Sequence, residues 1–347
     1  MKKFLTLAFA FVFMTGVAFA QSNDASILQE VDDSEASISQ VGSQNDADVS
    51  QILGNDNMLV NLEQDGSANQ ASVTQKYGQW HDAQVTQIGS GNELTLLQDN
   101  TSTLADVRQQ GDNNEADIYQ RNYRFAFGTF TSRVDLIQEG DNNEAGIHMD
   151  GFGNNVDVTQ VGDENEAFVS QDGDDNSVLI EQGVFGGASG SVADFTQEGD
   201  GNYFETKQVR SVDNTVTGTQ VGDDNFYRAS LGGSDNTVTM DMIGDANRGS
   251  WSIGSLGWPH QPEGNSLTID VDGDDNFSTG SIAGDHNTVE ITQYGSDNRI
   301  GDSWFTTDGV MIEGNHNTAT ISQMGDSNTA STMQMGNSNT ATITQGQ

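Results

Sequence analysis

The chain has 347 residues, no cysteine and a formal net charge of −40, from 12 Lys and Arg against 52 Asp and Glu. Hydrophobic residues make up only 33% and 40 glycines accompany two prolines, so the chain is too polar for a large apolar core and too poor in proline for an extended linker. The charge excludes nucleic acid and anionic lipid as partners. The lack of cysteine excludes disulfides, thiolate zinc sites and cysteine nucleophiles. Order must therefore come from a regular repeat.

The first twenty residues read as a secretory signal peptide. Met1, Lys2 and Lys3 precede an apolar run that ends in the small-residue motif around Ala18 and Ala20. This run is shorter than the roughly 20 apolar residues that span a bilayer, and polar sequence follows it at once. We predict cleavage after Ala20 and export of the mature chain, residues 21–347.

A unit of about 11 residues, Asn-x-Ala-x-Ile/Val-x-Gln-x-Gly-x-x, recurs through the mature chain. Asn165, Ala167, Val169, Gln171 and Gly173 form one complete example. About 27 units can be counted. The first five begin at Asn23, Ser34, Asn45, Asn57 and Asn69, and the last three begin at Asn317, Asn328 and Asn339.

The alternation within the unit predicts a strand with two different faces. Asn, Ala, Ile/Val and Gln occupy alternate positions, which is the period of a β-strand and not of a helix. The x-Gly-x-x segment has the composition of a turn. Each unit is then a strand of about seven residues and a turn of about four, and equal units coil into an all-β, β-solenoid fold with like residues stacked on like. The period alone does not decide whether one coil contains two strands or three.

Stacking of like residues predicts ladders of hydrogen-bonded amides in the interior, which would order a chain this polar. The predicted ladder residues are Gln40, Asn45, Gln51, Gln64, Asn69, Gln75, Gln160, Asn165, Gln171, Asn176, Gln323, Asn328, Gln334, Asn339 and Gln345. The predicted turn glycines are Gly42, Gly66, Gly162, Gly173, Gly325 and Gly336.

The spacings resemble the curlin repeat of curli, the bacterial amyloid fibres. Ser34, Gln40, Gly42, Asn45, Ala47 and Gln51 reproduce its motif in one run, and parts of it recur over roughly residues 23 to 347. The resemblance implies a coil of two strands and 22 residues, and extracellular self-assembly into amyloid fibres for adhesion and biofilm matrix. Curli subunits carry a segment before the repeats that engages an outer-membrane secretion pore. Here the repeats begin at Asn23, which leaves the export route open.

The repeat is interrupted in two ways. Other residues replace its amides: His81 and Thr103 stand for Asn, and Met149, Leu231, Met242, Ile253, Val271 and Ile282 stand for Gln. Insertions fall near residues 121–131, 183–190, 254–264 and 305–311. The first concentrates Arg121, Tyr123, Arg124, Phe125, Phe127 and Phe130, and it is either a tolerated loop or a contact for a partner.

No catalytic set can be nominated, so we expect no enzyme and no cofactor. The five histidines are scattered and force no metal site. Calcium is an open alternative at acidic turns such as Asp172 to Asn176, since it prefers oxygen ligands, although the turns match neither the EF-hand loop nor the calcium β-roll repeat.

These observations favour a secreted structural subunit over a binder. The repeats run to both ends of the mature chain without a polar cap, so unpaired strands would be offered to other chains. We expect fibres at the bacterial cell surface, with this chain, related curlin-like subunits and the outer-membrane export machinery as partners. The alternative is a monomeric surface solenoid, stabilised by calcium, that acts as an adhesin or binding module.

Overall fold

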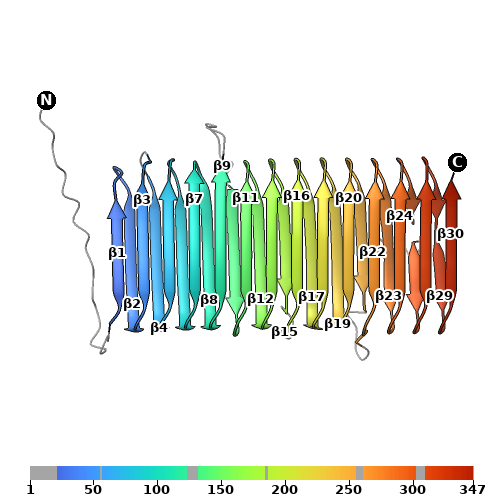
Figure 1. Cartoon of the computed structure of the whole chain (residues 1–347), viewed down its shortest axis with the longest axis horizontal. Helices are drawn as coiled ribbons and strands as arrows, with labels where there is room; N and C mark the ends of the chain where they lie inside the picture. Colours follow the sequence, from blue (N-terminus) through green and yellow to red (C-terminus); the bar gives the residue numbers. More distant parts are fainter. Residues whose placement is uncertain are drawn as a thin grey trace, which may run out of the picture.

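The computed structural model describes residues 22–54, 57–122, 132–183, 187–254, 261–301 and 309–346. All regular secondary structure in these ranges is β-strand. The strands lie side by side in chain order along the long axis, from the N-terminal to the C-terminal end of the chain (Figure 1). Within these ranges no helix is long and apolar enough to cross a membrane.

Two parallel sheets share the strands. The first sheet contains β1 (Asp24–Gln29), β3 (Asp46–Ile52), β5 (Gln70–Lys76), β7 (Glu93–Asn100), β9 (Glu115–Asn122), β11 (Glu144–Asp150), β13 (Glu166–Asp172), β16 (Val192–Glu198), β18 (Thr215–Val221), β20 (Thr237–Ile243), β22 (Ser266–Asp272), β24 (Thr288–Tyr294), β27 (Thr318–Met324) and β30 (Thr340–Gly346).

The second sheet contains β2 (Glu35–Ser43), β4 (Leu59–Ser67), β6 (Asp82–Ser90), β8 (Thr103–Asp112), β10 (Ser132–Glu139), β12 (Asn155–Asp163), β14 (Ser177–Gln182), β17 (Tyr203–Val212), β19 (Phe226–Ser234), β21 (Arg248–Ile253), β23 (Phe277–Ala283), β25 (Arg299–Ile300) and β28 (Thr329–Ala330). Three short strands complete it: β15 (Ala188–Ser189), β26 (Val310–Glu313) and β29 (Thr332–Met335).

Each strand pairs with the strand one coil away, in register with its equivalent residues. Gln29 of β1 lies opposite Gln51 of β3, 22 residues on, and Gln293 of β24 lies opposite Gln323 of β27, 30 residues on. The coil therefore contains two strands, one from each sheet, and the larger separation includes an insertion. The predicted β-solenoid is confirmed, and the question of two or three strands per coil is settled at two.

Alternate residues point into the narrow space between the sheets. In β3 the side chains of Ala47, Val49 and Gln51 are buried, while the residues between them face outward. The same pattern recurs from strand to strand, so one column mostly of Ala, Val or Leu, one mostly of Ile, Val or Leu and one mostly of Gln run along the axis of each sheet. The apolar columns form the core, which is only a few side chains wide.

The middle of the solenoid is packed differently because aromatic side chains enter these columns. Phe195 and Phe204 stack with ring centroids 3.6 Å apart, and Phe204 lies 5.3 Å from Tyr227. Glycines make the room: a Cβ atom on Gly218 would lie 2.9 Å from Phe204, and one on Gly249 would lie 2.5 Å from Tyr227. Large and small inward residues thus compensate one another across neighbouring strands.

The turns explain the Gly-x-x-Asn part of the repeat. Gly140 has φ +125°, and a Cβ atom there would lie 2.1 Å from the carbonyl oxygen of Gly162 on the next coil. The residue just before the buried Asn is in the left-handed region, as Asp175 is at φ 57° before Asn176. In the same turn as Gly140, the backbone N–H of Asp141 donates a hydrogen bond of 2.9 Å to the carboxylate of Asp163 on the next coil. Acidic turn residues therefore cap backbone groups of the neighbouring coil.

The prediction that the fourth unit begins at Asn57 is wrong. Asn57 is exposed with φ 66°, so it fills the left-handed turn position, and the buried position belongs to Met58. Met58 stands seven residues after Gln51, whereas Asn45 stands five residues after Gln40, and the buried position falls one residue later than the predicted Asn57.

The predicted insertions lie largely outside the described residues, as do Tyr123, Arg124, Phe125, Phe127 and Phe130. Of the segment 183–190, β15 pairs with β12 and β17. Of the segment 254–264, Pro262 is buried, and its carbonyl oxygen accepts hydrogen bonds from Ser234 N–H at 3.0 Å and Asn236 Nδ2 at 3.1 Å. The signal-cleavage residues Ala18 and Ala20 also lie outside the described residues.

Candidate functional site: amide rows and terminal coils

Glutamine side chains form a row along each sheet. In the first sheet Gln51 Nε2 donates to Gln75 Oε1 at 2.9 Å, and Gln75 Nε2 donates to Gln98 Oε1 at 2.8 Å. In the second sheet Gln64 and Gln87 are joined in the same way at 2.8 Å. These side chains are buried, so their amides are satisfied by one another in place of water.

The same amides also tie the two sheets together. Gln75 Nε2 donates its second hydrogen to the carbonyl oxygen of Leu59, the first residue of β4, at 2.9 Å. Gln64 Nε2 reaches the carbonyl of Asp46, at the start of β3, at 3.0 Å. Each glutamine therefore links a coil to the next coil and one sheet to the other, which makes it the central polar connection of the fold.

Asparagines form a second set of rows where turns enter strands. Asn69 accepts nothing from Asn45 but donates to it twice: its backbone N–H and its Nδ2 both donate to Asn45 Oδ1 at 3.1 Å. Asn69 Nδ2 also donates to the carbonyl of Gly89 on the following coil at 2.9 Å. On the second-sheet side, the backbone N–H of Asn176 donates to Asn154 Oδ1 at 2.9 Å and its Nδ2 donates to the carbonyl of Gly199 at 2.7 Å.

The two sets of rows have opposite polarity. Within its row each glutamine donates to the glutamine toward the C-terminal end, as from Gln51 to Gln75, whereas each asparagine donates to the asparagine toward the N-terminal end, as from Asn69 to Asn45. Any coil that continues the stack must satisfy both directions at once. This polarity admits a parallel, in-register strand and disfavours an inverted one.

The structure places the predicted ladder residues at inward positions. Gln40, Gln51, Gln64, Gln75, Gln160, Gln171 and Gln323 each donate to the glutamine of the next coil at 2.8 to 3.1 Å. Asn45, Asn69, Asn165, Asn176, Asn328 and Asn339 each donate to an asparagine of the preceding coil. Gln345 accepts from Gln323 and donates to the Thr329 carbonyl at 2.9 Å.

Gln334 is the exception among these residues. Ile312 of β26 lies one coil toward the N-terminus and has no amide to donate to the Oε1 of Gln334, while Gln334 Nε2 donates to the backbone carbonyl of Thr318 at 2.9 Å. The predicted turn glycines Gly42, Gly66, Gly162, Gly173, Gly325 and Gly336 all have positive φ, between 90° and 133°.

Where an aliphatic residue replaces glutamine, the row is broken and an oxygen is left without a donor. The buried Oε1 atoms of Gln171, Gln293 and Gln334 accept no hydrogen bond from the described residues. Met149, Val271 and Ile312 lie opposite them, one coil toward the N-terminus. In the second sheet Leu231, Ile253, Ile282 and Ile312 follow one another, so the row there becomes an apolar column. The sequence identified Met149 and Val271 as substitutions in the row but not Ile312, and it did not show which atom each substitution leaves unsatisfied.

The asparagine row of the second sheet is replaced near its N-terminal end by Ser34, Met58, His81 and Thr103. His81 Nδ1 lies 2.7 Å from Thr103 Oγ1, and its Nε2 is buried without a partner among the described residues. Burial lowers the pKa of His81 from 6.5 to about 4, so it is neutral in the folded chain at neutral pH.

Carboxylates crowd both outer faces. Burial raises the pKa of Glu144 on the first sheet, and the neighbouring Glu115 and Glu166 raise it further. On the second sheet burial and Asp135 raise the pKa of Asp106 and of Asp157. Stacked like charges therefore oppose close packing at neutral pH, and protonation relieves them.

The remaining histidines in the described ranges stack and do not converge on a ligand. The rings of Tyr119 and His148 lie 4.8 Å apart on the first sheet, and those of His286 and His316 lie 5.1 Å apart at successive turns. The described parts of the chain hold no group of three or more His, Asp or Glu side chains placed to bind a metal ion.

In the part of the chain that the structure describes, the rows end at the terminal coils. Among the described residues β1 pairs only with β3, and β30 pairs only with β27. Ile27 in β1 and Ile343 in β30 are half-buried and contact the core on one side only. Gln29 already donates to Gln51 at 2.7 Å, so its Oε1 is the acceptor at the N-terminal end of the first-sheet row.

The fold and the amide rows place this chain in a class of repeat proteins, the β-solenoids, in which equal coils stack along one axis. Comparison with known families matches the curlin-associated repeat at residues 32–60, 59–89, 132–162, 153–183 and 314–346. The chain therefore carries curlin-associated repeats in these stretches. The stretch from 184 to 313, which lies outside these matches, includes the aliphatic column. No curated protein matches the chain significantly.

Proposed function

We propose that the chain is a secreted structural subunit of curli-like extracellular amyloid fibres, with roles in cell adhesion and biofilm matrix and without catalysis. The observation that carries the proposal is that each coil holds the next through the same in-register amides and backbone pairs. A contact that repeats within one chain can repeat between chains, because an added β-strand meets the same acceptors and donors.

The geometry supports addition of whole coils end to end. Gln345 in β30 is the last glutamine of the first-sheet row, and Gln29 in β1 is the first. In a stack of two chains, Gln345 of one chain would donate to the Oε1 of Gln29 of the next. Ile343 and Ile27 would cover one another as Ile343 and Ile321 do within the chain. Assembly would thus bury the two half-exposed ends of the core. Related curlin-like subunits would add by the same contacts, and export would precede assembly.

The proposal is tested by placing one charge on a terminal coil. Ile343→Lys puts an ammonium group where a second chain would bury an isoleucine, so we expect folded chains that do not elongate seeds of the parent protein. Thr342→Lys, on the outer face of the same strand, is the matched control and should elongate them. Far-UV circular dichroism checks that both variants fold. Equal elongation by the two variants would contradict end-to-end addition.

A further inference from the structure

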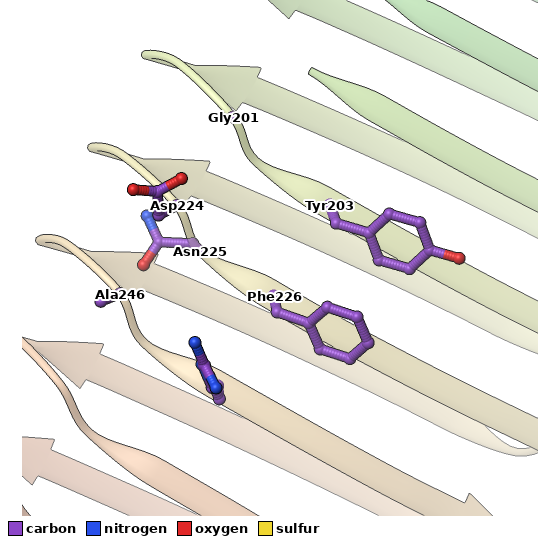
Figure 2. Close-up of a pocket in the computed structure, with 7 residues that line it drawn as sticks. Gly201, Tyr203, Asp224, Asn225, Phe226 and Ala246 are labelled. Carbon is purple, nitrogen blue, oxygen red and sulfur yellow. The ribbon is translucent and has the colours of Figure 1, made fainter. Parts of the chain in front are cut away.

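A hollow lies on the outer face of the second sheet, where β17, β19 and β21 begin (Figure 2). Its volume is about 700 Å³, within the range of small-molecule sites. Tyr203, Phe226 and Arg248 are in register on successive coils and form one wall. Three small or short turn residues, Gly201, Asp224 and Ala246, form the other.

The aromatic wall is ordered. The rings of Tyr203 and Phe226 lie 4.9 Å apart at an interplanar angle of 10°, and Figure 2 shows them side by side along the solenoid. Tyr203 is held by a hydrogen bond of 3.0 Å from its hydroxyl to Glu205, which in turn accepts from Arg228 Nε at 2.7 Å. Both rings are half-buried, so part of each remains exposed to the hollow. Rigid aromatic surface of this kind binds at low entropic cost.

The charged groups at the hollow are one donor and one acceptor, and the amide of Asn225, which also lines it, is buried. Arg248 is exposed, and no carboxylate among the described residues lies within ion-pair distance of it. Asp224 is exposed on the opposite wall. A guanidinium group that only donates and a carboxylate that only accepts suit a ligand with several hydroxyl groups.

The charge of the chain narrows the class of ligand. A net charge of −40 repels polyanions from the whole surface. A polycation would be attracted to the acidic turns along the whole chain, but the positive charge of Arg248 would repel it at this hollow. A neutral ligand with apolar C–H faces for the rings and hydroxyl groups for Arg248 and Asp224 complements every wall. Three coils span about 10 Å along the axis, enough for a short run of sugar rings.

We propose that this hollow binds a neutral polysaccharide, with sugar faces on Tyr203 and Phe226 and hydroxyl groups on Arg248 and Asp224. In a fibre the site would recur once per subunit, so many weak sites would hold one polymer. The site lies on a sheet face and not on a terminal coil, so it goes beyond the proposed assembly and does not depend on it.

The test is calorimetric titration of the soluble mature chain with cellohexaose, maltohexaose and chitohexaose, and with hexagalacturonate as the acidic comparison. We expect at least one neutral hexasaccharide to bind, with an affinity that added salt does not change, and hexagalacturonate to bind more weakly. Phe226→Ala should lower the affinity at least tenfold, and Arg248→Gln several-fold. Phe226→Trp should retain binding, because it keeps an aromatic face.

Tyr294→Ala is the matched control, since Tyr294 is an exposed tyrosine on the first sheet. It should bind as the parent chain does. The proposal is overturned if none of the neutral hexasaccharides binds, if Phe226→Ala binds as tightly as the parent, or if hexagalacturonate binds best. Unchanged circular dichroism of each variant shows that a lost affinity is not lost folding.

Discussion

Gln171 lies directly over Met149 in the first sheet, and its buried Oε1 accepts no hydrogen bond from the described residues, because the methionine thioether has nothing to donate. On the other side of Met149, Gln120 Nε2 donates to the Leu104 carbonyl at 2.9 Å and to no side chain in the described ranges. One residue thus interrupts two hydrogen bonds. The stability of the fold therefore depends on contacts between neighbouring coils. The effect of a substitution on stability depends on which residues lie at the same position on the coils beside it.

Met149→Gln should stabilise the chain. The new amide would accept from Gln120 and donate to Gln171, in a space that already holds a side chain of similar size, and would satisfy a buried oxygen. We expect a gain of about 1–2 kcal/mol in the free energy of unfolding, measured by urea denaturation. Met240→Gln is the control: Met240 is equally buried but lies between Gly218 and Ile269. It should destabilise, and a gain there would refute the pairing argument.

His81 should make stability fall in mild acid. Its pKa is about 4 in the fold and 6.5 in the unfolded chain, so between these values the unfolded chain binds a proton that the folded chain does not. Stability is then full above pH 6.5 and declines as the pH falls toward 4, by about 2 kcal/mol at pH 5.

The variant His81→Asn should remove this decline, because asparagine does not titrate and suits the row. Urea midpoints at pH 7 and pH 5 measure the effect. His148→Asn, on the outer face of the first sheet, is the matched control and should keep the decline of the parent. If His81→Asn and the parent lose stability equally between the two pH values, the account of His81 is wrong.

Turn glycines should differ in cost according to what lies on the next coil. Gly140→Ala combines a φ of +125° with a Cβ atom 2.1 Å from the carbonyl of Gly162, so a backbone shift is unavoidable. Gly336→Ala has a φ of +98°, but its nearest atom lies 3.7 Å away. We expect Gly336→Ala to lower the free energy of unfolding by about 1–2 kcal/mol from backbone conformation alone, and Gly140→Ala to lower it by more. Thermal unfolding of the two variants compares them, and equal losses would show that stacking at the turn is unimportant.

The strands and their inward residues were predictable because period-two alternation and the recurrence of Asn, Gln and Gly follow directly from strand geometry. The number of strands per coil was not, because two and three equal strands satisfy the same 11-residue pattern. Asn57 misled because Asn suits both the buried row and the left-handed turn position, and only the longer turn decides between them. Sequence spacing also carries no information on hydrogen-bond direction, so the polarity of the rows and the unsatisfied oxygen of Gln171 required coordinates.

The hollow beside Tyr203 and Phe226 was missed for a related reason. These residues are 23 positions apart, and each alone is an ordinary outward aromatic residue of a strand. Only the register of β17, β19 and β21 brings them beside Arg248. The signal that could have found them is the column obtained by writing the sequence one coil per line.

The central claim is that the coil contacts continue between chains, and a time course of thioflavin fluorescence on the purified mature chain tests it most directly. We expect fibres whose lag is shortened by seeds, by added salt and by pH 5, because protonation of crowded carboxylates such as Glu144 relieves repulsion. Fibre diffraction should show a reflection at about 4.8 Å, from strands that run perpendicular to the fibre axis. A chain that remains monomeric and β-rich at both pH values, with or without seeds, would contradict the account, and folding that depended on calcium would favour a monomeric surface solenoid.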